Sequence, residues 1–182
     1  CTLIICVYQI FVVLLYSNSG KMLQTTQAVI LNCRKKGDNS SLVETYTQEQ
    51  GRVDFMVFGN KWKSTLQPMA VVEISYQQTP TRTMGTITEV TRTFVPQNQD
   101  MAHQCITLFM AEIIEKSLRL PLTDETLFNW LTNSIKKLDQ MDELSNFAAE
   151  FMAQLSTLLG YGGAVLDEWR DLKSLDIIQT IQ

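Results

Sequence analysis

The sequence predicts an α+β protein in which a small β-barrel precedes a bundle of α-helices. Residues 26–91 contain five short runs rich in β-branched and aromatic residues, with turn-forming segments between them. After Pro96 the apolar residues change from a period of about 2 to a period of about 3.6, which is typical of amphipathic helices. The charge changes at the same place: nine basic and six acidic residues over 21–95 give way to six basic and thirteen acidic residues over 96–182.

The five predicted strands are short and closely spaced. They cover Thr26–Asn32, Ser41–Thr47, Arg52–Phe58, Met69–Tyr76 and Met84–Thr91. Lys36–Ser40 predicts a turn after the first strand, and Gln50-Gly51 predicts a tight hairpin between the second and third strands. Longer links at Gly59–Pro68 and Gln77–Thr83 separate the remaining strands. Five strands at this spacing favour the OB-fold, a five-stranded barrel.

Four helices are predicted in the second half, which we interpret as an all-α helical bundle. The first covers Met101–Leu118, and the second begins after Thr123, the predicted N-cap. The third has apolar residues at i, i+3 and i+4 from Leu144 to Leu159, and Gly160 is its predicted stop. Residues 164–178 predict a fourth helix.

Residues 1–21 differ from the rest of the chain. Residues 2–16 are almost entirely apolar and carry no charge, but they are shorter than the roughly 20 residues that span a bilayer. They also lack the basic first region and the cleavage site of a signal peptide. We therefore expect 1–21 to be a non-native or leader extension before Met22, with a membrane or secretory segment as the alternative. The expected domains are then 22–95 and 96–182.

The sequence does not predict catalysis. It contains no GxGxxG, GxxxxGK[ST] or GxSxG pattern. The single histidine, His103, lies in an apolar helix, and a general base needs an oriented nucleophile beside it, so a structural role is expected. The four cysteines are scattered, which with one histidine predicts free thiols and no metal site. We expect neither a cofactor nor a small-molecule substrate.

Basic residues of the predicted barrel gather in its loops. In an OB-fold, nucleic acid binds at the loops between strands 1 and 2 and between strands 4 and 5, and on the face of strands 2 and 3. Cationic side chains neutralise phosphates, and an aromatic ring can stack on a base. Ordinary solvated charge, with Trp62 packed on the barrel, explains the same pattern. The candidate nucleic-acid residues from this pattern are Arg34, Lys35, Lys36, Lys61, Trp62, Lys63 and Arg82.

The order of several short motifs resembles the RecO family of bacterial recombination mediators, and in particular its Bacteroidetes members. Each motif is loose, but their joint order is specific, and the match runs from Met22 to Tyr161. The motifs are an opening strand at Met22–Leu31, Gly-Asp-x-x-x-Leu from Gly37, Tyr46-Thr47, Gly51-Arg52, Leu66-Gln67-Pro68, Leu108–Glu112 and Leu158–Tyr161.

The resemblance implies an N-terminal OB-fold, a helical C-terminal domain and a non-catalytic role in DNA repair. It implies binding to single- and double-stranded DNA, strand annealing, and help in loading the RecA recombinase onto DNA coated by the single-stranded DNA-binding protein SSB. The implied partners are the acidic tail of SSB and RecR. Lys116 and Arg119 are predicted to meet that tail beside an apolar groove. The DNA-contact residues implied by the resemblance are Arg34, Lys35, Lys36, Arg52, Lys61, Lys63 and Arg82.

The sequence departs from the family pattern in two respects. Some members carry a four-cysteine zinc motif after the Leu-Gly-Tyr segment, whereas this chain has no cysteine after Cys105, so no zinc is expected. Other members continue with further helices, so the bundle is expected to be incomplete. We expect a cytoplasmic, nucleoid-associated protein. Two alternatives remain: a protein–protein adaptor that uses the barrel as a scaffold, and a membrane-tethered protein if 1–16 is native.

Overall fold

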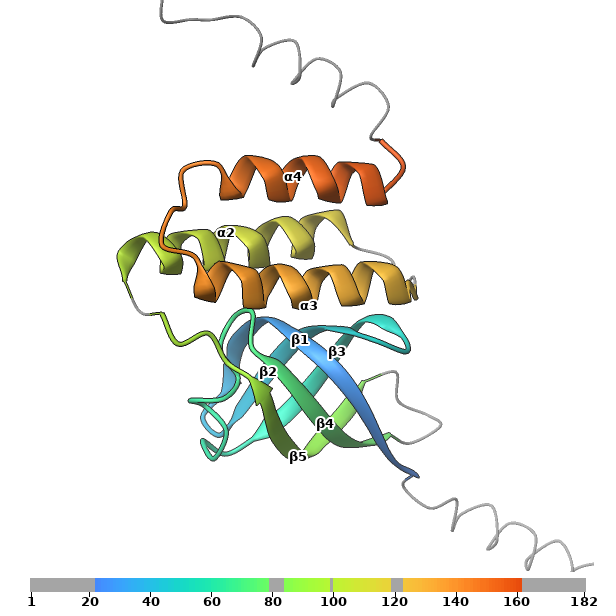
Figure 1. Ribbon diagram of the computed structural model, residues 1–182. Coiled ribbons are helices and arrows are strands. Elements are labelled where there is room, and N and C mark those ends of the chain that lie inside the picture. The colour runs from blue at the N-terminus through green and yellow to red at the C-terminus, as the bar shows by residue number, and fades with distance from the viewer. Residues whose placement is uncertain (1–21, 79–83, 99, 119–122, 162–182) are drawn as a thin grey trace, which may run out of the picture.

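The computed structural model describes residues 22–78, 84–98, 100–118 and 123–161 (Figure 1). Five strands form a barrel and three helices lie over one of its ends, with α4 farthest from the barrel. The predicted extension 1–21 and the predicted helix 164–178 lie outside the described residues. The elements are β1 (Met22–Gly37), β2 (Ser40–Thr47), β3 (Gly51–Phe58), β4 (Val71–Gln78), β5 (Gly85–Phe94), α2 (Met101–Ser117), α3 (Glu125–Gln140) and α4 (Phe147–Leu158).

The barrel is closed, with the strand order β1-β2-β3-β5-β4. Neighbouring strands are antiparallel except β3 and β5, which meet in a short parallel contact where Phe55 pairs with Gly85. An ideal Cβ on Gly85 would lie 2.7 Å from Tyr76 Cδ2, so this closing contact has room only for glycine. The predicted five-stranded OB-fold followed by a helical bundle is confirmed.

Strand β1 is much longer than predicted. Its first part, from Met22 to Val29, pairs with β4, and its second part, from Ala28 to Gly37, pairs with β2. The prediction that Arg34-Lys35-Lys36 lies in a loop is therefore wrong, because Arg34 and Lys35 pair with Leu42 and Ser41 in the ladder. Register shifts next to Ile30 and Lys35 let the strand bend around the barrel.

The predicted hairpin between β2 and β3 is confirmed. Thr47 pairs with Gly51, whose φ of 68° is in the left-handed region that glycine adopts without strain. The Thr47 hydroxyl accepts a hydrogen bond from the Gln50 backbone N–H at 3.1 Å and donates one to the Gly51 carbonyl at 3.0 Å.

Strand β4 reaches Gln78, two residues into the predicted link, and residues 79–83 lie outside the described part of the chain.

Two apolar cores stabilise the fold. One fills the barrel and includes Ala28, Ile30 and Phe55. The other lies between barrel and helices, where Val29 and Tyr46 pack with residues of all three helices. The Tyr46 ring stacks on Phe128 of α3 at a centroid distance of 6.3 Å, and its burial raises the pKa of Tyr46 to about 12. Alternate residues of β1 thus face different cores.

The helix ends show one correct and one wrong prediction. The N-cap of α3 is Asp124, whose carboxylate accepts a hydrogen bond from the Leu127 N–H at 3.0 Å. Thr123, the predicted cap, instead donates its hydroxyl to the Glu49 carbonyl at 3.0 Å. Gly160 ends α4 as predicted, with a φ of 84° and hydrogen bonds from its own N–H and from that of Tyr161 back to the last turn.

Candidate nucleic-acid interface

A polar cleft opens between the β1–β2 turn and the β3–β4 link. Its volume is about 310 Å³. The backbone N–H of Gly59 donates a hydrogen bond to the Asn39 carbonyl at 3.0 Å, which ties the two walls together. The link itself is folded, since the Leu66 N–H donates to the Trp62 carbonyl at 2.9 Å. The lining residues are Cys33, Lys35, Gly37, Asp38, Asn39, Ser40, Ser41, Val57, Gly59, Asn60, Trp62, Lys63 and Leu66.

Three lysines surround this cleft. Lys35 and Lys63 line it from opposite walls and are exposed, so their charges face solvent. Lys61 places its Nζ 5.0 Å from the centroid of the half-buried Trp62 ring, a cation–π arrangement. Lys36 is exposed but does not line the cleft. The structure thus brings Lys35, Trp62 and Lys63, three of the predicted DNA-binding residues, to one site.

The cleft also holds residues that were not among the predicted DNA-binding residues. Asp38, Asn39 and Asn60 are exposed turn residues, and their side chains mix hydrogen-bond donors and acceptors. Their nearness to the lysine pairs in sequence was the available signal. Cys33 lies on the same wall as Lys35, and its partial burial raises the pKa of the thiol, although Ser41 and Lys63 act to lower it. A raised pKa keeps the Cys33 thiol uncharged at neutral pH.

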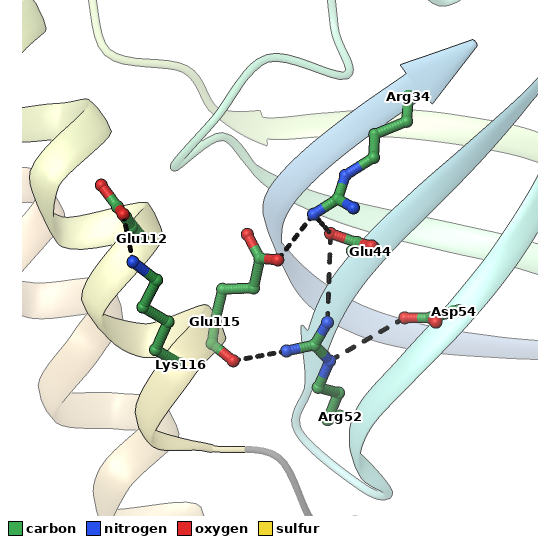
Figure 2. A network of polar contacts seen from close by, with 7 residues as sticks. All are labelled: Arg34, Glu44, Arg52, Asp54, Glu112, Glu115 and Lys116. Carbon is green, nitrogen blue, oxygen red and sulfur yellow. Dashed lines mark hydrogen bonds and ion pairs between the residues drawn. The ribbon is translucent and has the colours of Figure 1, made fainter.

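Arg34 and Arg52 belong to a different arrangement, an ion-pair network between the barrel and α2 (Figure 2). Arg34 Nη2 lies 2.7 Å from Glu115 Oε1 on α2 and 3.2 Å from Glu44 Oε2 on β2. Arg52 Nη1 donates a hydrogen bond to the Glu115 backbone carbonyl at 2.6 Å. Its guanidinium also lies 3.9 Å from Glu44 and 4.0 Å from Asp54. Both arginines, which were predicted to contact DNA, hold the bundle to the barrel.

Strand geometry explains why neighbouring basic residues separate. Successive side chains of a strand point to opposite faces, so Cys33 and Lys35 line the cleft while Arg34 reaches α2.

Glu44 is the buried centre of the ion-pair network, and desolvation raises its pKa. Glu115 and Asp54 raise this pKa further, whereas Arg34 and Arg52 lower it.

One of the two predicted partner-binding residues, Lys116, lies on α2 within the described residues. Lys116 forms an ion pair with Glu112 one turn earlier on α2, and both side chains are exposed (Figure 2). Arg119 and the DNA-binding candidate Arg82 lie outside the described residues. An apolar groove of about 270 Å³ is present, but on α3 and α4, lined by Trp130, Ala153, Gln154, Thr157 and Leu158. Lys116 does not line it.

His103 is buried and has structural partners. Its backbone N–H and ring Nδ1 contact the Asp100 carboxylate, which caps α2. Its Nε2 lies 2.9 Å from the Met141 carbonyl, after α3. The contacts of His103 with the Asp100 carboxylate lower the pKa of Asp100, and the backbone N–H of His103 contributes most. His103 therefore joins the start of α2 to the segment between α3 and α4.

These features define a class of protein: an OB-fold barrel joined to a helical bundle, with a cationic, aromatic cleft on the barrel. Within the described residues, no helix has the length and apolar character needed to cross a membrane.

Comparison with known proteins identifies the family. The family model described as recombination protein O N terminal matches residues 22–94, and the one described as recombination protein O C terminal matches residues 98–165. The chain therefore belongs to the RecO family.

Several relatives are named DNA repair protein RecO. The one from Bacteroides fragilis is 32% identical over 149 residues, which cover 76% of this chain and 61% of the relative. The one from Porphyromonas gingivalis is 27% identical over 167 residues, covering 82% and 68%. The one from Salinibacter ruber is 25% identical over 148 residues, covering 77% and 57%. The chain thus spans about three fifths of the length of the relatives it matches.

Proposed function

We propose that this chain is a non-catalytic, DNA-binding mediator of recombinational repair, which binds single- and double-stranded DNA and anneals strands. The observation that carries the proposal is the cleft on the OB-fold barrel, which Lys35, Lys63 and Trp62 line. Membership of the RecO family supports it. Exposed lysines bind phosphates and release counterions, which makes the affinity fall steeply with salt. Lys61, next to Trp62, adds positive charge beside the cleft, and Lys36 is a further proposed phosphate contact outside it.

Annealing follows from the same electrostatics. Two strands repel each other through their phosphates, and a cationic surface that holds both backbones lowers this repulsion. The bundle carries the opposite charge, with thirteen acidic and six basic residues over 96–182. Nucleic acid is therefore expected on the barrel side of the molecule.

The experiment that tests this function is fluorescence anisotropy of labelled single-stranded and duplex oligonucleotides, titrated with the full chain at several salt concentrations. Each phosphate contact to a single strand contributes about 0.7 to the slope of log affinity against log salt, so Lys35→Ala with Lys63→Ala should reduce the slope by about 1.4. Lys136→Ala is the matched control, because Lys136 is an exposed lysine on α3 of the acidic bundle. Its slope should equal that of the wild type.

Two outcomes contradict the proposal. A folded protein that binds no oligonucleotide at about 50 mM salt, where multi-phosphate binding is strong, overturns it. Binding that hardly depends on salt favours the adaptor, in which the barrel is a scaffold and the acidic bundle carries the interaction.

We further propose that the acidic tail of SSB and RecR are partners, that the chain helps to load recombinase onto SSB-coated DNA, and that it acts in the cytoplasm at the nucleoid. Lys116 and Arg119 are the proposed contacts for the tail. The ion pair of Lys116 with Glu112 is exposed and therefore weak, so an acidic peptide can compete for the ammonium group. Titration with the acidic tail peptide tests this, since Lys116→Ala should weaken binding and Lys136→Ala should not.

A further inference from the structure

We propose that the cleft between the β1–β2 turn and the β3–β4 link is a pocket for one unpaired base, so that the chain holds a single strand by its bases as well as by its phosphates. This inference rests on the proposed function and specifies the ligand of the same site. The cleft is lined by Trp62, by Lys35 and Lys63, and by Asp38, Asn39 and Asn60.

The size of the cleft fits a single nucleotide. Its volume of about 310 Å³ lies at the lower end of the range for small-molecule pockets, roughly 300–1,000 Å³. A groove that only follows a sugar–phosphate backbone is an open surface and needs no such hollow. The volume is therefore large enough for one base between the two walls.

Backbone hydrogen bonds and one buried residue hold the walls of the cleft in place. The Gly59 N–H donates to the Asn39 carbonyl at 3.0 Å, which continues the pairing of Ser40 with Phe58 and joins the two walls. The Lys63 N–H donates to the Asn60 carbonyl at 3.3 Å within the link. Leu66, at the end of the link, is buried in the barrel core and anchors that wall. A preformed site loses little conformational entropy on binding.

The side chains around the hollow have the chemistry of a base site and not of a phosphate site alone. Two side-chain amides, from Asn39 and Asn60, can both donate and accept hydrogen bonds, as base edges require. The carboxylate of Asp38 would repel a phosphate but accepts a hydrogen bond from an exocyclic amino group such as that of cytosine. Lys35 and Lys63 remain for the phosphate of the same nucleotide.

Trp62 supplies the stacking surface. Trp62 lines the cleft and packs against the barrel core on one side. The ammonium group of Lys61, an exposed side chain, lies over the ring at 5.0 Å from its centroid, and a base that stacks on this face takes its place. Stacking on an aromatic ring requires a base that is free of the duplex, since paired bases stack on each other. The pocket should therefore favour a single strand over a duplex of the same charge density.

The test compares three probes with the full chain: labelled oligodeoxycytidylate, an abasic oligonucleotide of the same length, and a blunt duplex. Trp62→Ala should weaken binding of oligodeoxycytidylate by about 5-fold or more, the lower limit expected for one lost stacking contact. Binding of the abasic strand and the duplex should change by less than about 2-fold, because their phosphate contacts remain. Trp62→Phe should keep most of the affinity for oligodeoxycytidylate.

A second variant guards against a folding defect, since Trp62 is half-buried against the barrel core. Asn39→Ala with Asn60→Ala removes two exposed amides and no apolar contact, and it should reduce the preference for oligodeoxycytidylate over the abasic strand by about 5-fold, in line with two modest hydrogen bonds. Equal losses for all three probes, or no loss with folded variants, overturn the base pocket while leaving the proposed function intact. A wild-type chain that binds none of the probes overturns both.

Discussion

Arg52 on β3 caps the C-terminal end of α2: its Nη1 donates a hydrogen bond to the backbone carbonyl of Glu115 at 2.6 Å (Figure 2). The last four carbonyls of an α-helix have no partner within the helix, and a cation there also interacts favourably with the helix dipole. The same guanidinium faces the buried carboxylate of Glu44. The Arg52 side chain thus stabilises both the end of α2 and the buried charge of Glu44.

Replacement of this arginine should destabilise the fold. Arg52→Ala is expected to lower the free energy of unfolding by about 2–3 kcal/mol, because it removes a charged hydrogen bond and leaves Glu44 less compensated. Urea denaturation measures the change. Lys36→Ala removes an exposed cation from the same barrel and should stay within about 0.5 kcal/mol of the wild type. Equal effects of the two substitutions would contradict a structural role for Arg52.

The raised pKa of Glu44 predicts that the effect of its neutral analogue, Glu44→Gln, on stability depends on pH. Desolvation makes the folded state bind a proton at Glu44 more tightly than the unfolded chain does. The stability from this group is therefore complete below its ordinary pKa of 4.5 and is lost as the pH rises through the folded-state pKa. Glu44→Gln, which mimics the protonated form, should be more stable relative to the wild type at pH 7 than at pH 4.

Chemical denaturation of both proteins at several pH values checks this prediction. The difference between the two curves isolates Glu44 from groups with lowered pKa values, such as Asp100 and Glu112. Those carboxylates contribute stability above their ordinary pKa, and it is lost as the pH falls through the lowered value. A difference that grows toward acid pH would show that the arginines, and not desolvation, dominate at Glu44.

The cap of α3 gives a prediction that separates two adjacent residues. Asp124→Ala should lower stability by about 1 kcal/mol, because the Leu127 N–H loses its acceptor. Asp124→Asn keeps an acceptor oxygen and should retain most of that stability. Thr123→Ala removes only an exposed hydrogen bond to the Glu49 carbonyl and should have the smaller effect. Thermal unfolding followed by circular dichroism measures all three, and a larger effect of Thr123→Ala would restore Thr123 as the cap.

Closure of the barrel depends on the absence of a side chain at Gly85. Gly85→Ala would place a methyl group 2.7 Å from the Tyr76 ring and 3.2 Å from that of Phe55, so overpacking of about 1–3 kcal/mol is expected. Gly37→Ala is the control, because its new Cβ meets only the Ser40 hydroxyl, which can rotate away. Comparison of the two denaturation midpoints tests the prediction. An unchanged midpoint for Gly85→Ala would mean that β3 and β5 can separate without loss.

The sequence was sufficient to predict the fold class because apolar residues keep a strand period of about 2 before Pro96 and a helix period of about 3.6 after it. The five β-branched runs became the five strands, and Gln50-Gly51 became the predicted hairpin. The exact extent of β1 was not predictable, because its basic end, Arg34 to Lys36, has low strand propensity and is held in the ladder by pairing with β2. Tertiary pairing there overrode the local preference.

The candidate site was predictable only in part, for a related reason. A loop presents all its basic residues to solvent, whereas a strand divides them between two faces. The prediction therefore placed Arg34 and Lys35 in one site. In the structure Arg34 donates a hydrogen bond to Glu115, whereas Lys35 lines the cleft. The exchange of Thr123 for Asp124 as the helix cap has a similar origin, since both residues are good caps and only the entry path of the chain distinguishes them.

The core shared by barrel and helices has a consequence for how this chain can be divided. Val29, Leu31 and Tyr46 of the barrel are almost fully buried, and their neighbours include residues of α2, α3 and α4. A gene fragment that ends after β5 would encode a barrel with this apolar patch in water, and such a patch promotes association. The segments 22–94 and 98–165, which two separate family models match, are thus expected to unfold together in one cooperative transition.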